Sequence, residues 1–234
     1  MSGLTDFQVQ VARIFFALPE SAGFLVAGGA ALIAQELVDR ETRDLDLFAS
    51  PRPSVTTAVE AFESALTGHG WTVTRTQDGA QFVRLLVHGA EDLIVDIGVD
   101  SAPERTPVMC VLGPSYDPLE LAGRKLLALF DRAEARDFTD VHALANLYGT
   151  NTILEVASHL DAGLTPDLLA TSISTAHRFR PTEFPIPAED VPDMLAFFTA
   201  WREQLLDSSP AADNTSQPGP ESRTPPPLAG ETDA

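Results

Sequence analysis

Three aspartates stand out as residues whose spacing suits metal chemistry. Asp44 and Asp46 flank a single leucine, and Asp96 lies within the apolar run Leu-Ile-Val-Asp-Ile. Side chains two residues apart on a strand point to the same side, so Asp44 and Asp46 form a carboxylate pair. Such a pair repels itself unless a cation lies between its members. Because Mg²⁺ prefers carboxylate and phosphate oxygens, we expect a metal site that Asp96 completes from a neighbouring strand.

A glycine pair, Gly28-Gly29, lies between an apolar run and a helix-forming segment. Such a pair lets backbone N–H groups approach phosphates closely, and the helix that begins there turns its positive end towards them. Together with the aspartates this pattern indicates two-metal phosphoryl transfer, in which Asp96 helps to deprotonate an attacking hydroxyl. Taken singly, the features have ordinary alternatives: a tight turn, a solvated strand face and an edge residue. Their ordered combination favours phosphoryl transfer.

Lys125 is the only lysine in a chain with fourteen arginines. It lies beside the apolar stripe of Ala122, Leu126 and Leu129, which aims its ammonium along the core-facing edge of a helix towards bound phosphates. A compact ammonium serves where a planar guanidinium does not. The alternatives are chance and a surface lysine whose stem covers apolar atoms.

Asp137 shares a helical face with Val141 and Leu144, so we expect it to point inward and to position Lys125 or a substrate group. The alternative is an acid in a first turn that stabilises the helix dipole. Asp140 is the weaker candidate for the same role.

Two residues next to the carboxylate pair are further candidates. Thr42 stands two residues before Asp44, so we expect it to line the same pocket. Arg43 carries a positive charge beside the pair, and we expect it to meet a phosphate.

The elements that position these residues change character along the chain. Short apolar runs between turns predict strands in the first half, and helical periodicity predominates from Pro118 onward, where Asp117 and Glu120 predict a capping box. We expect strands over residues 24–26, 44–48, 71–75, 81–87 and 93–99, and helices over 5–18, 30–37, 55–66, 118–132, 138–148, 151–161, 166–177 and 190–206.

This pattern predicts an α+β chain with its site between two parts. Beyond the last helix the composition lacks large apolar residues, which predicts a disordered tail. The expected divisions are an N-terminal helix over residues 1–19, an α/β domain over 20–112, a helical domain over 113–207 and the tail over 208–234.

Composition and charge limit the cellular location and the binding partners that we expect for the protein. The longest apolar stretch, 24–34, is shorter than a bilayer span, and the single cysteine, Cys110, cannot form an internal disulfide, so we expect a cytoplasmic protein without a membrane partner. The net charge of −19, about −16 outside the tail, disfavours broad binding to nucleic acid. We expect arginines around the site to offset it locally: Arg43, Arg84, Arg124, Arg132 and Arg136.

Two blocks of sequence resemble a known family. GGAALIAQELVDRETRDLDLF resembles the first motif of the polymerase-β-like nucleotidyltransferases, and specifically of the AbiEii-type toxins that include the mycobacterial MenT group. LELAGRKLLALFDRAEARDFTDVHAL resembles the lysine-bearing helix and Arg-Asp-x-x-Asp pattern of that family. The resemblance covers residues 23–148. It departs in its Gly-Gly, where many relatives have Gly-Ser, and in the fourteen residues between Gly29 and Asp44, about one more than is usual.

The resemblance implies a fold, a reaction and partners. The fold is a polymerase-β-like nucleotidyltransferase domain, a mixed sheet flanked by helices, followed by a helical domain. The reaction is Mg²⁺-dependent transfer of a nucleoside monophosphate from an NTP to an acceptor hydroxyl, with release of pyrophosphate. The implied acceptor is the 3′ end of tRNA, and the implied partner is a cognate antitoxin.

The same resemblance implies roles for individual residues, and other functions stay open beside it. Lys125 binds the nucleotide, as do Gly28 and Gly29, and Asp137 joins the catalytic group. An acceptor other than tRNA, either a protein or a cationic small molecule such as an aminoglycoside, suits the acidic body. A non-catalytic nucleotide-binding module is the third possibility, which the complete set of aspartates and Lys125 disfavours.

Overall fold

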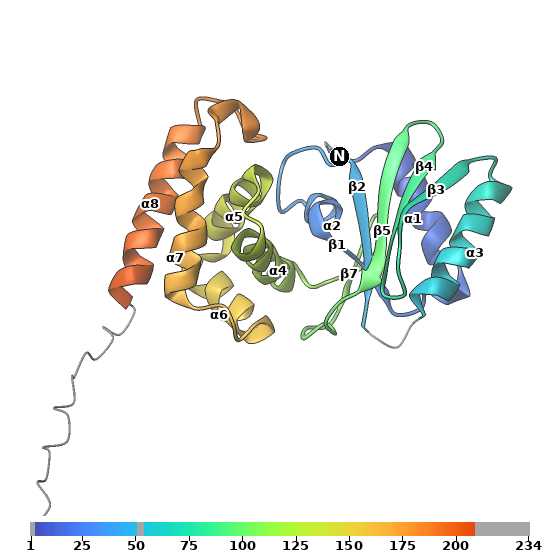
Figure 1. Ribbon diagram of the computed structural model, residues 1–234, viewed down its shortest axis with the longest axis horizontal. Coiled ribbons are helices and arrows are strands. Elements are labelled where there is room, and N and C mark those ends of the chain that lie inside the picture. The colour runs from blue at the N-terminus through green and yellow to red at the C-terminus, as the bar shows by residue number, and fades with distance from the viewer. Residues whose placement is uncertain (1–2, 51–53, 209–234) are drawn as a thin grey trace, which may run out of the picture.

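The computed structural model describes residues 3–50 and 54–208 of the chain. Within these residues the first half forms one mixed sheet with flanking helices, and the second half is helical (Figure 1). The strands are β1 (Phe24–Ala27), β2 (Asp44–Ala49), β3 (Thr72–Asp78), β4 (Phe82–His88), β5 (Asp92–Val99), β6 (Val108–Cys110) and β7 (Gly113–Ser115).

The first three of the described helices flank the sheet, and the other five build the second half. They are α1 (Asp6–Phe16), α2 (Gly28–Ala34), α3 (Val55–Gly68), α4 (Pro118–Asp131), α5 (Ala135–Tyr148), α6 (Thr150–Leu160), α7 (Pro166–Ser174) and α8 (Val191–Ser208). Three short 3₁₀ helices lie at Pro19–Ser21, Thr175–Arg178 and Pro181–Glu183. No helix in these ranges is long and apolar enough to cross a bilayer.

The strand order in the sheet is β3-β4-β5-β2-β1-β7-β6. β2 pairs in parallel with β5, and β1 with β7, whereas the remaining neighbours are antiparallel. The predicted α+β class, a mixed sheet followed by helices, is confirmed. The register sets Asp46 directly opposite Asp96, which confirms the prediction that Asp96 lies on the neighbouring strand.

Strand β2 shows why the carboxylates face away from the core. Leu45, Leu47 and Ala49 alternate with Asp44 and Asp46 and are buried. Helices α1 and α3 cover one face of the sheet (Figure 1), and these apolar side chains share a core cluster with Val11 of α1 and Phe62 of α3. Burying a leucine stabilises the fold by about 1.5–3 kcal/mol, so this alternation fixes which face the aspartates occupy.

Two element boundaries differ from the prediction for identifiable reasons. α2 ends at Ala34 instead of residue 37 because Glu36 adopts a positive φ of 59°, which ends the helix. α5 begins at Ala135 instead of residue 138, since Glu134 and Asp137 form a reciprocal capping box there.

The capping box predicted for Asp117 and Glu120 is wrong in its second member. Asp117 caps α4 by accepting hydrogen bonds from the N–H groups of Leu119 and Glu120. The side chain of Glu120 is instead fully buried and accepts from the backbone of Glu104 at 3.1 Å and of Arg105 at 2.9 Å. Glu120 therefore fastens the loop after β5 to α4, a contact between distant parts of the chain.

The sheet also extends beyond the expected division at residue 112. β7 pairs with β1, and the hydroxyl of Ser115 donates to the carbonyl of Val26 at 2.9 Å. α1 shares the core of the sheet with α3, so the described residues 3–19 pack with the α/β half. The tail prediction concerns residues 209–234, which lie outside the described residues; α8 itself continues through Ser208.

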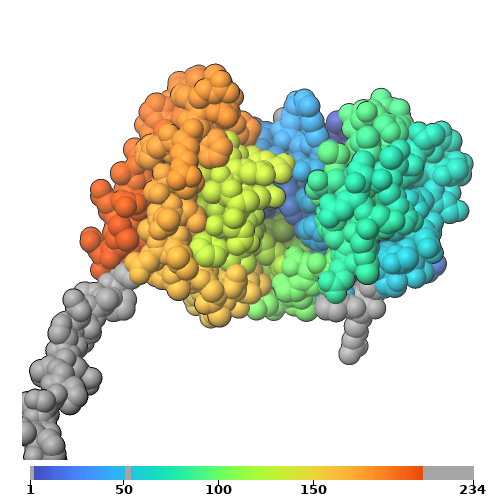
Figure 2. Space-filling model, viewed as in Figure 1, coloured from blue at the N-terminus to red at the C-terminus, as the bar shows by residue number. Residues whose placement is uncertain are grey.

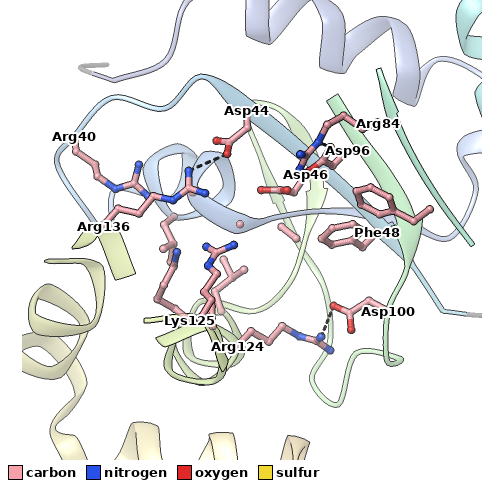
Figure 3. A pocket seen from close by; sticks show the side chains of 18 residues that line it. Arg40, Asp44, Asp46, Phe48, Arg84, Asp96, Asp100, Arg124, Lys125 and Arg136 are labelled. Atoms are coloured by element: carbon pink, nitrogen blue, oxygen red, sulfur yellow. Dashed lines mark hydrogen bonds and ion pairs between the residues drawn. The ribbon is translucent and has the colours of Figure 1, made fainter. Parts of the chain in front are cut away.

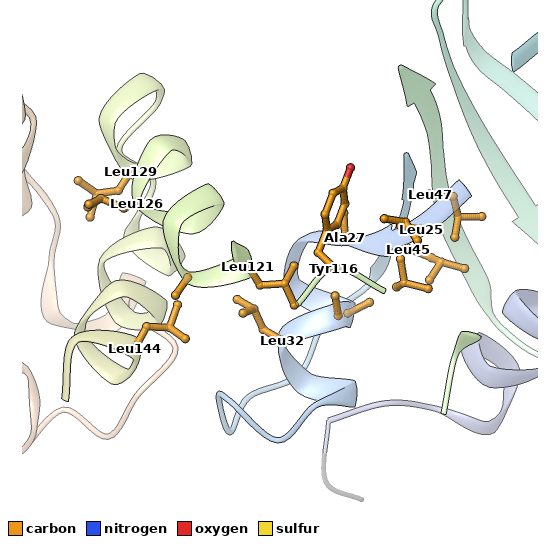
Figure 4. Packing of buried hydrophobic residues seen from close by; sticks show 14 of the residues in the cluster. Leu25, Ala27, Leu32, Leu45, Leu47, Tyr116, Leu121, Leu126, Leu129 and Leu144 are labelled. Carbon is orange, nitrogen blue, oxygen red and sulfur yellow. The ribbon is translucent and has the colours of Figure 1, made fainter. Parts of the chain in front are cut away.

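A single hydrophobic core connects the two halves. Leu32 of α2 meets Leu121 of α4, and the fully buried Tyr116 lies beside them (Figure 4). The core continues from there to Leu45 in the sheet and to Leu144 in α5. Packing across this boundary holds the helical half against the open face of the sheet.

Candidate active site

A cavity of about 380 Å³ lies between the open face of the sheet and helices α4 and α5. In the space-filling view the molecule is hollowed between these two parts (Figure 2). Its walls therefore come from both halves of the chain, as the sequence predicts. The lining residues are Ala27, Gly28, Gly29, Leu32, Arg40, Asp44, Asp46, Phe48, Phe82, Arg84, Asp96, Asp100, Leu121, Arg124, Lys125, Ala128, Arg132 and Arg136.

The glycine pair is required by close approach to two charged side chains. Gly28 has a φ of +62°, and a Cβ there would lie 1.8 Å from Oδ2 of Asp46. A Cβ on Gly29 would lie 2.7 Å from Nη2 of Arg40. Since only glycine permits both approaches, the turn between β1 and α2 stays in contact with the carboxylates.

The three predicted aspartates line the cavity with different partners (Figure 3). Asp44 accepts a hydrogen bond from the hydroxyl of Thr42 and forms an ion pair with Nη1 of Arg136 at 3.0 Å. Asp96 binds Arg84 through both oxygens, at 2.7 and 2.6 Å. Asp46 lies between them.

Crowding of negative charge shifts the pKa of the central carboxylate. Burial, together with the charges of Asp44 and Asp96, raises the pKa of Asp46 to about 7. Burial also disfavours the charge of Asp44, but the Thr42 hydrogen bond and Arg136 outweigh it and lower the pKa of Asp44. Burial and the two neighbouring carboxylates thus disfavour the charged form of Asp46.

The donor chemistry of this site fits a divalent cation. Three carboxylates face one cavity, and a bound cation would favour the charged form of the buried Asp46. Over residues 3–50 and 54–208, however, no three metal-binding side chains converge as a ligand set. In the structure Arg84 binds Asp96 and Arg136 binds Asp44.

Lys125 is buried and doubly paired, which excludes the alternative of a surface lysine. Its Nζ lies 3.2 Å from Oδ1 of Asp137 and 3.0 Å from Oδ2 of Asp140. Lys125 is 6% exposed, and both aspartates are fully buried. The structure thus brings Asp137 to Lys125 as the sequence predicts, and it places Asp140, the weaker candidate, equally close.

Arginines extend this pair into a network that is buried at Arg40 and partly exposed at Arg132, whose side chain is 44% exposed. Arg40 binds Asp140 through two hydrogen bonds of 2.6 and 2.7 Å, and Arg132 binds Asp137 through two of 2.9 Å. Burial opposes the charge of Asp137, yet Arg132 and Lys125 lower its pKa. Arg40 is a site residue that sequence reasoning missed, since its partner lies 100 residues away.

Thr42 and Arg43 fall on opposite sides of the extended chain. Thr42 is buried and bonds Asp44, although it does not itself line the cavity. Arg43 is exposed and lies outside the cavity, which corrects the expectation that it meets a phosphate there. Alternation explains the difference, because neighbouring residues of an extended chain point to opposite sides.

The wall of the cavity carries more cations than carboxylates although the chain is strongly negative. Six cationic side chains line it against four carboxylates, in a chain with a formal charge of −19. Four of the five arginines expected near the site belong to this set, and Arg40 takes the place of Arg43. A cavity lined with arginines and a lysine attracts polyphosphates.

Comparison with known structures identifies the architecture. JHP933 from Helicobacter pylori is 19% identical, and the match covers 88% of this chain and 96% of that one with a TM-score of 0.52. A putative nucleotidyltransferase from H. pylori is 16% identical over 87% of this chain and 98% of that one, with a TM-score of 0.52. MenT4, a nucleotidyltransferase toxin from Mycobacterium tuberculosis, is 16% identical over 87% and 93% of the respective chains, with a TM-score of 0.48.

The fold and the family agree on one class of protein, the nucleotidyltransferases. The chain belongs to the family described as "Nucleotidyl transferase AbiEii toxin, Type IV TA system", whose sequence profile matches residues 12–205. The resemblance seen in the sequence motifs is thereby confirmed. No curated protein sequence matches this chain significantly.

Proposed function

We propose that this protein is a Mg²⁺-dependent enzyme that transfers a nucleoside monophosphate from an NTP to the 3′ end of tRNA. In this proposal it acts as the toxin of a pair and is restrained by a cognate antitoxin. One observation carries the chemical part: three aspartates on adjacent strands face Lys125 and five arginines within one cavity. Membership of the toxin family supports the biological part.

Asp44, Asp46 and Asp96 would hold two Mg²⁺ ions. Such ions, when bound, neutralise the triphosphate and favour ionisation of the attacking hydroxyl. Arg84 and Arg136 have side chains 45% and 39% exposed, so they can leave the carboxylates and turn to phosphate oxygens.

The remaining residues would position the two substrates. Gly28 and Gly29 border the cavity beside Asp46, where their backbone N–H groups would meet the donor phosphates. Lys125 borders the same space from α4 and is held in place by Asp137 and Asp140. Once Arg84 has moved, a carboxylate oxygen of Asp96 is free to accept the proton of the acceptor hydroxyl.

A cationic small molecule is the second candidate acceptor, and a neighbouring cavity favours it. This cavity of about 400 Å³ shares Asp100, Arg124 and Ala128 with the first. Asp131 and Asp161 add two further carboxylates to its wall. The negative charge suits an amine-bearing acceptor such as an aminoglycoside.

The two acceptors are separated by incubating the full chain with labelled NTPs, Mg²⁺ and either total tRNA or an aminoglycoside panel. We expect label on tRNA 3′ ends and none on the drugs. Asp44→Asn removes a metal-binding charge at similar volume, so we expect transfer to fall at least about 100-fold with the fold retained. Thermal melting checks the fold, and normal transfer by Asp44→Asn would refute the metal site.

The toxin role needs a test in cells. Expression of the wild type in a sensitive host should slow growth and alter tRNA 3′ ends, whereas Asp44→Asn should do neither. Sequencing of tRNA 3′ ends from both cultures measures the outcome. Identical growth with unmodified ends would refute the tRNA toxin and leave transfer to another acceptor as the function.

A further inference from the structure

Two phenylalanines form an apolar strip in the wall of the charged cavity. Phe48 stands two residues after Asp46 on β2, and Phe82 two residues before Arg84 on β4. Side chains two residues apart share a face of a sheet, so both rings lie on the cavity side, where both line the wall. In the register of the sheet, each phenylalanine pairs with Gly98 of β5.

Gly98 lets the two rings converge. A Cβ at this position would lie 3.0 Å from Cδ2 of Phe82 and 3.2 Å from Cε1 of Phe48. Both rings thus lie over a strand that places no side chain between them. Because both rings are only half-buried, they keep apolar surface that the core does not cover.

Charged groups flank this aromatic floor, defined as Phe48, Phe82 and Gly98. The next row of side chains on the same face consists of Asp46, Asp96 and Arg84. This row lies two residues along the strands from the floor, a distance of about 7 Å. The guanidinium of Arg84 lies 5.9 Å from the ring centroid of Phe82. A flat apolar surface next to metal-binding carboxylates and a movable arginine matches the parts of a nucleotide: a base, a sugar hydroxyl and a phosphate.

The far end of the floor is also charged. Asp100 lies beyond Phe48, away from Asp96, and pairs with Arg124 at 2.8 Å (Figure 3). Arg124 also binds Glu120 at 2.8 Å and its side chain is 13% exposed, so this group of ion pairs closes the far end of the floor.

The topology of the sheet separates the floor from the space for the donor. Gly28 follows β1, which neighbours β2 on the side away from β5 and β4. Phe82 lies on β4, beyond β5 and its carboxylate Asp96. The glycine turn and the floor thus lie on opposite sides of Asp46.

We propose that Phe48 and Phe82 stack against the unpaired terminal base of a nucleic-acid acceptor and so bring its hydroxyl to Asp96. This assignment rests on the proposed function, in which Asp96 serves the acceptor. The floor itself offers ring faces, so it accepts any base by stacking and excludes acceptors without one. The floor therefore recognises a single-stranded end and does not select a particular sequence.

The test uses fluorescein-labelled single-stranded RNA that ends in a 3′-deoxynucleotide, so that it binds without reacting, and a matched RNA whose terminal nucleotide is abasic. Fluorescence anisotropy with the full chain and Mg²⁺ measures both affinities. Loss of one stacked base weakens binding about tenfold or more, which we expect between the two RNAs for the wild type. Phe82→Ala should bind both RNAs with the same weak affinity, and Phe82→Tyr should retain the preference.

Three outcomes would overturn the proposal. The first is equal binding of the two RNAs by the wild type, and the second is no binding of either. In the third, Phe82→Ala raises KM for the NTP and leaves RNA affinity unchanged, which would assign the floor to the donor base. Phe82→Leu, which keeps apolar volume without a ring, replaces Phe82→Ala if that variant fails to fold.

Failure of the proposed function has a separate signature. Absence of transfer from every NTP to unblocked tRNA would refute the proposed reaction, while anisotropy, which needs no turnover, would still report whether the terminal base rests on the floor.

Discussion

Two sets of ion pairs border the same cavity and differ in depth. On the helix side, Lys125 pairs with Asp137 and Asp140, and Arg40 reaches Asp140. The Arg40 side chain is 6% exposed and both aspartates are fully buried. On the strand side, the cations that hold Asp44 and Asp96 are partly exposed.

This difference in depth separates a fixed scaffold from exchangeable contacts. Breaking a buried pair leaves an uncompensated charge away from water and costs about 3–5 kcal/mol. An exposed pair contributes about 0–1 kcal/mol, so a bound ligand can replace it easily. The helix side therefore holds Lys125 in one position, whereas the strand side can release its carboxylates.

The largest expected effect is on the helix side. Asp140→Asn removes the charge shared by Arg40 and Lys125, and we expect the free energy of unfolding to fall by about 3–5 kcal/mol. Chemical denaturation monitored by circular dichroism measures this change. Arg136→Gln is the matched control on the strand side, because Arg136 and its partner Asp44 have side chains 39% and 23% exposed, and we expect a loss of at most about 1 kcal/mol.

Equal losses in the two variants would break the comparison. They would show that depth does not distinguish the two sets of pairs. A loss only in Arg136→Gln would reverse the assignment of scaffold and exchangeable contacts.

The strand side was predictable from the sequence, and the helix side only in part. Alternation on a strand with one covered face dictates that Asp44 and Asp46 point together, so a local pattern sufficed. Helical periodicity placed Lys125 next to an apolar stripe, but periodicity gives a direction and not a depth. Whether Lys125 reaches water depends on α5, which packs against α4. A local sequence pattern does not predict which helix packs on which.

The features that sequence reasoning missed all depend on long-range pairing. Arg40 meets Asp140 across 100 residues, and Glu120 holds a loop 15 and 16 residues earlier in the chain. The aromatic floor forms only when three strands come into register. Most helices and strands were predicted within a few residues, since periodicity and turn residues are local.

An intermediate effect is expected when the ammonium on the helix side is replaced by a guanidinium. Lys125→Arg keeps the charge, but a planar fork cannot occupy the compact space between Asp137 and Asp140 in the same way. We expect transfer to fall at least about tenfold, a loss of about 1.4 kcal/mol in transition-state stabilisation. Kinetic assay of nucleotide transfer measures it, and wild-type rates would show that position 125 requires only a charge.

The smallest expected effect comes from removing residues that belong to neither set of pairs. A chain that ends at Asp207 keeps the buried anchors of α8, Trp201 and Leu205, which are 3% and 4% exposed. The removed segment contains one large apolar residue, Leu228, so its loss takes little apolar surface from the folded state. We expect the melting temperature to change by at most about 2 °C, which corresponds to less than about 1 kcal/mol in a chain of this size. Transfer should equal that of the full chain, because the cavity and both sets of pairs remain; a much larger fall in melting temperature would show that the segment stabilises the helical half.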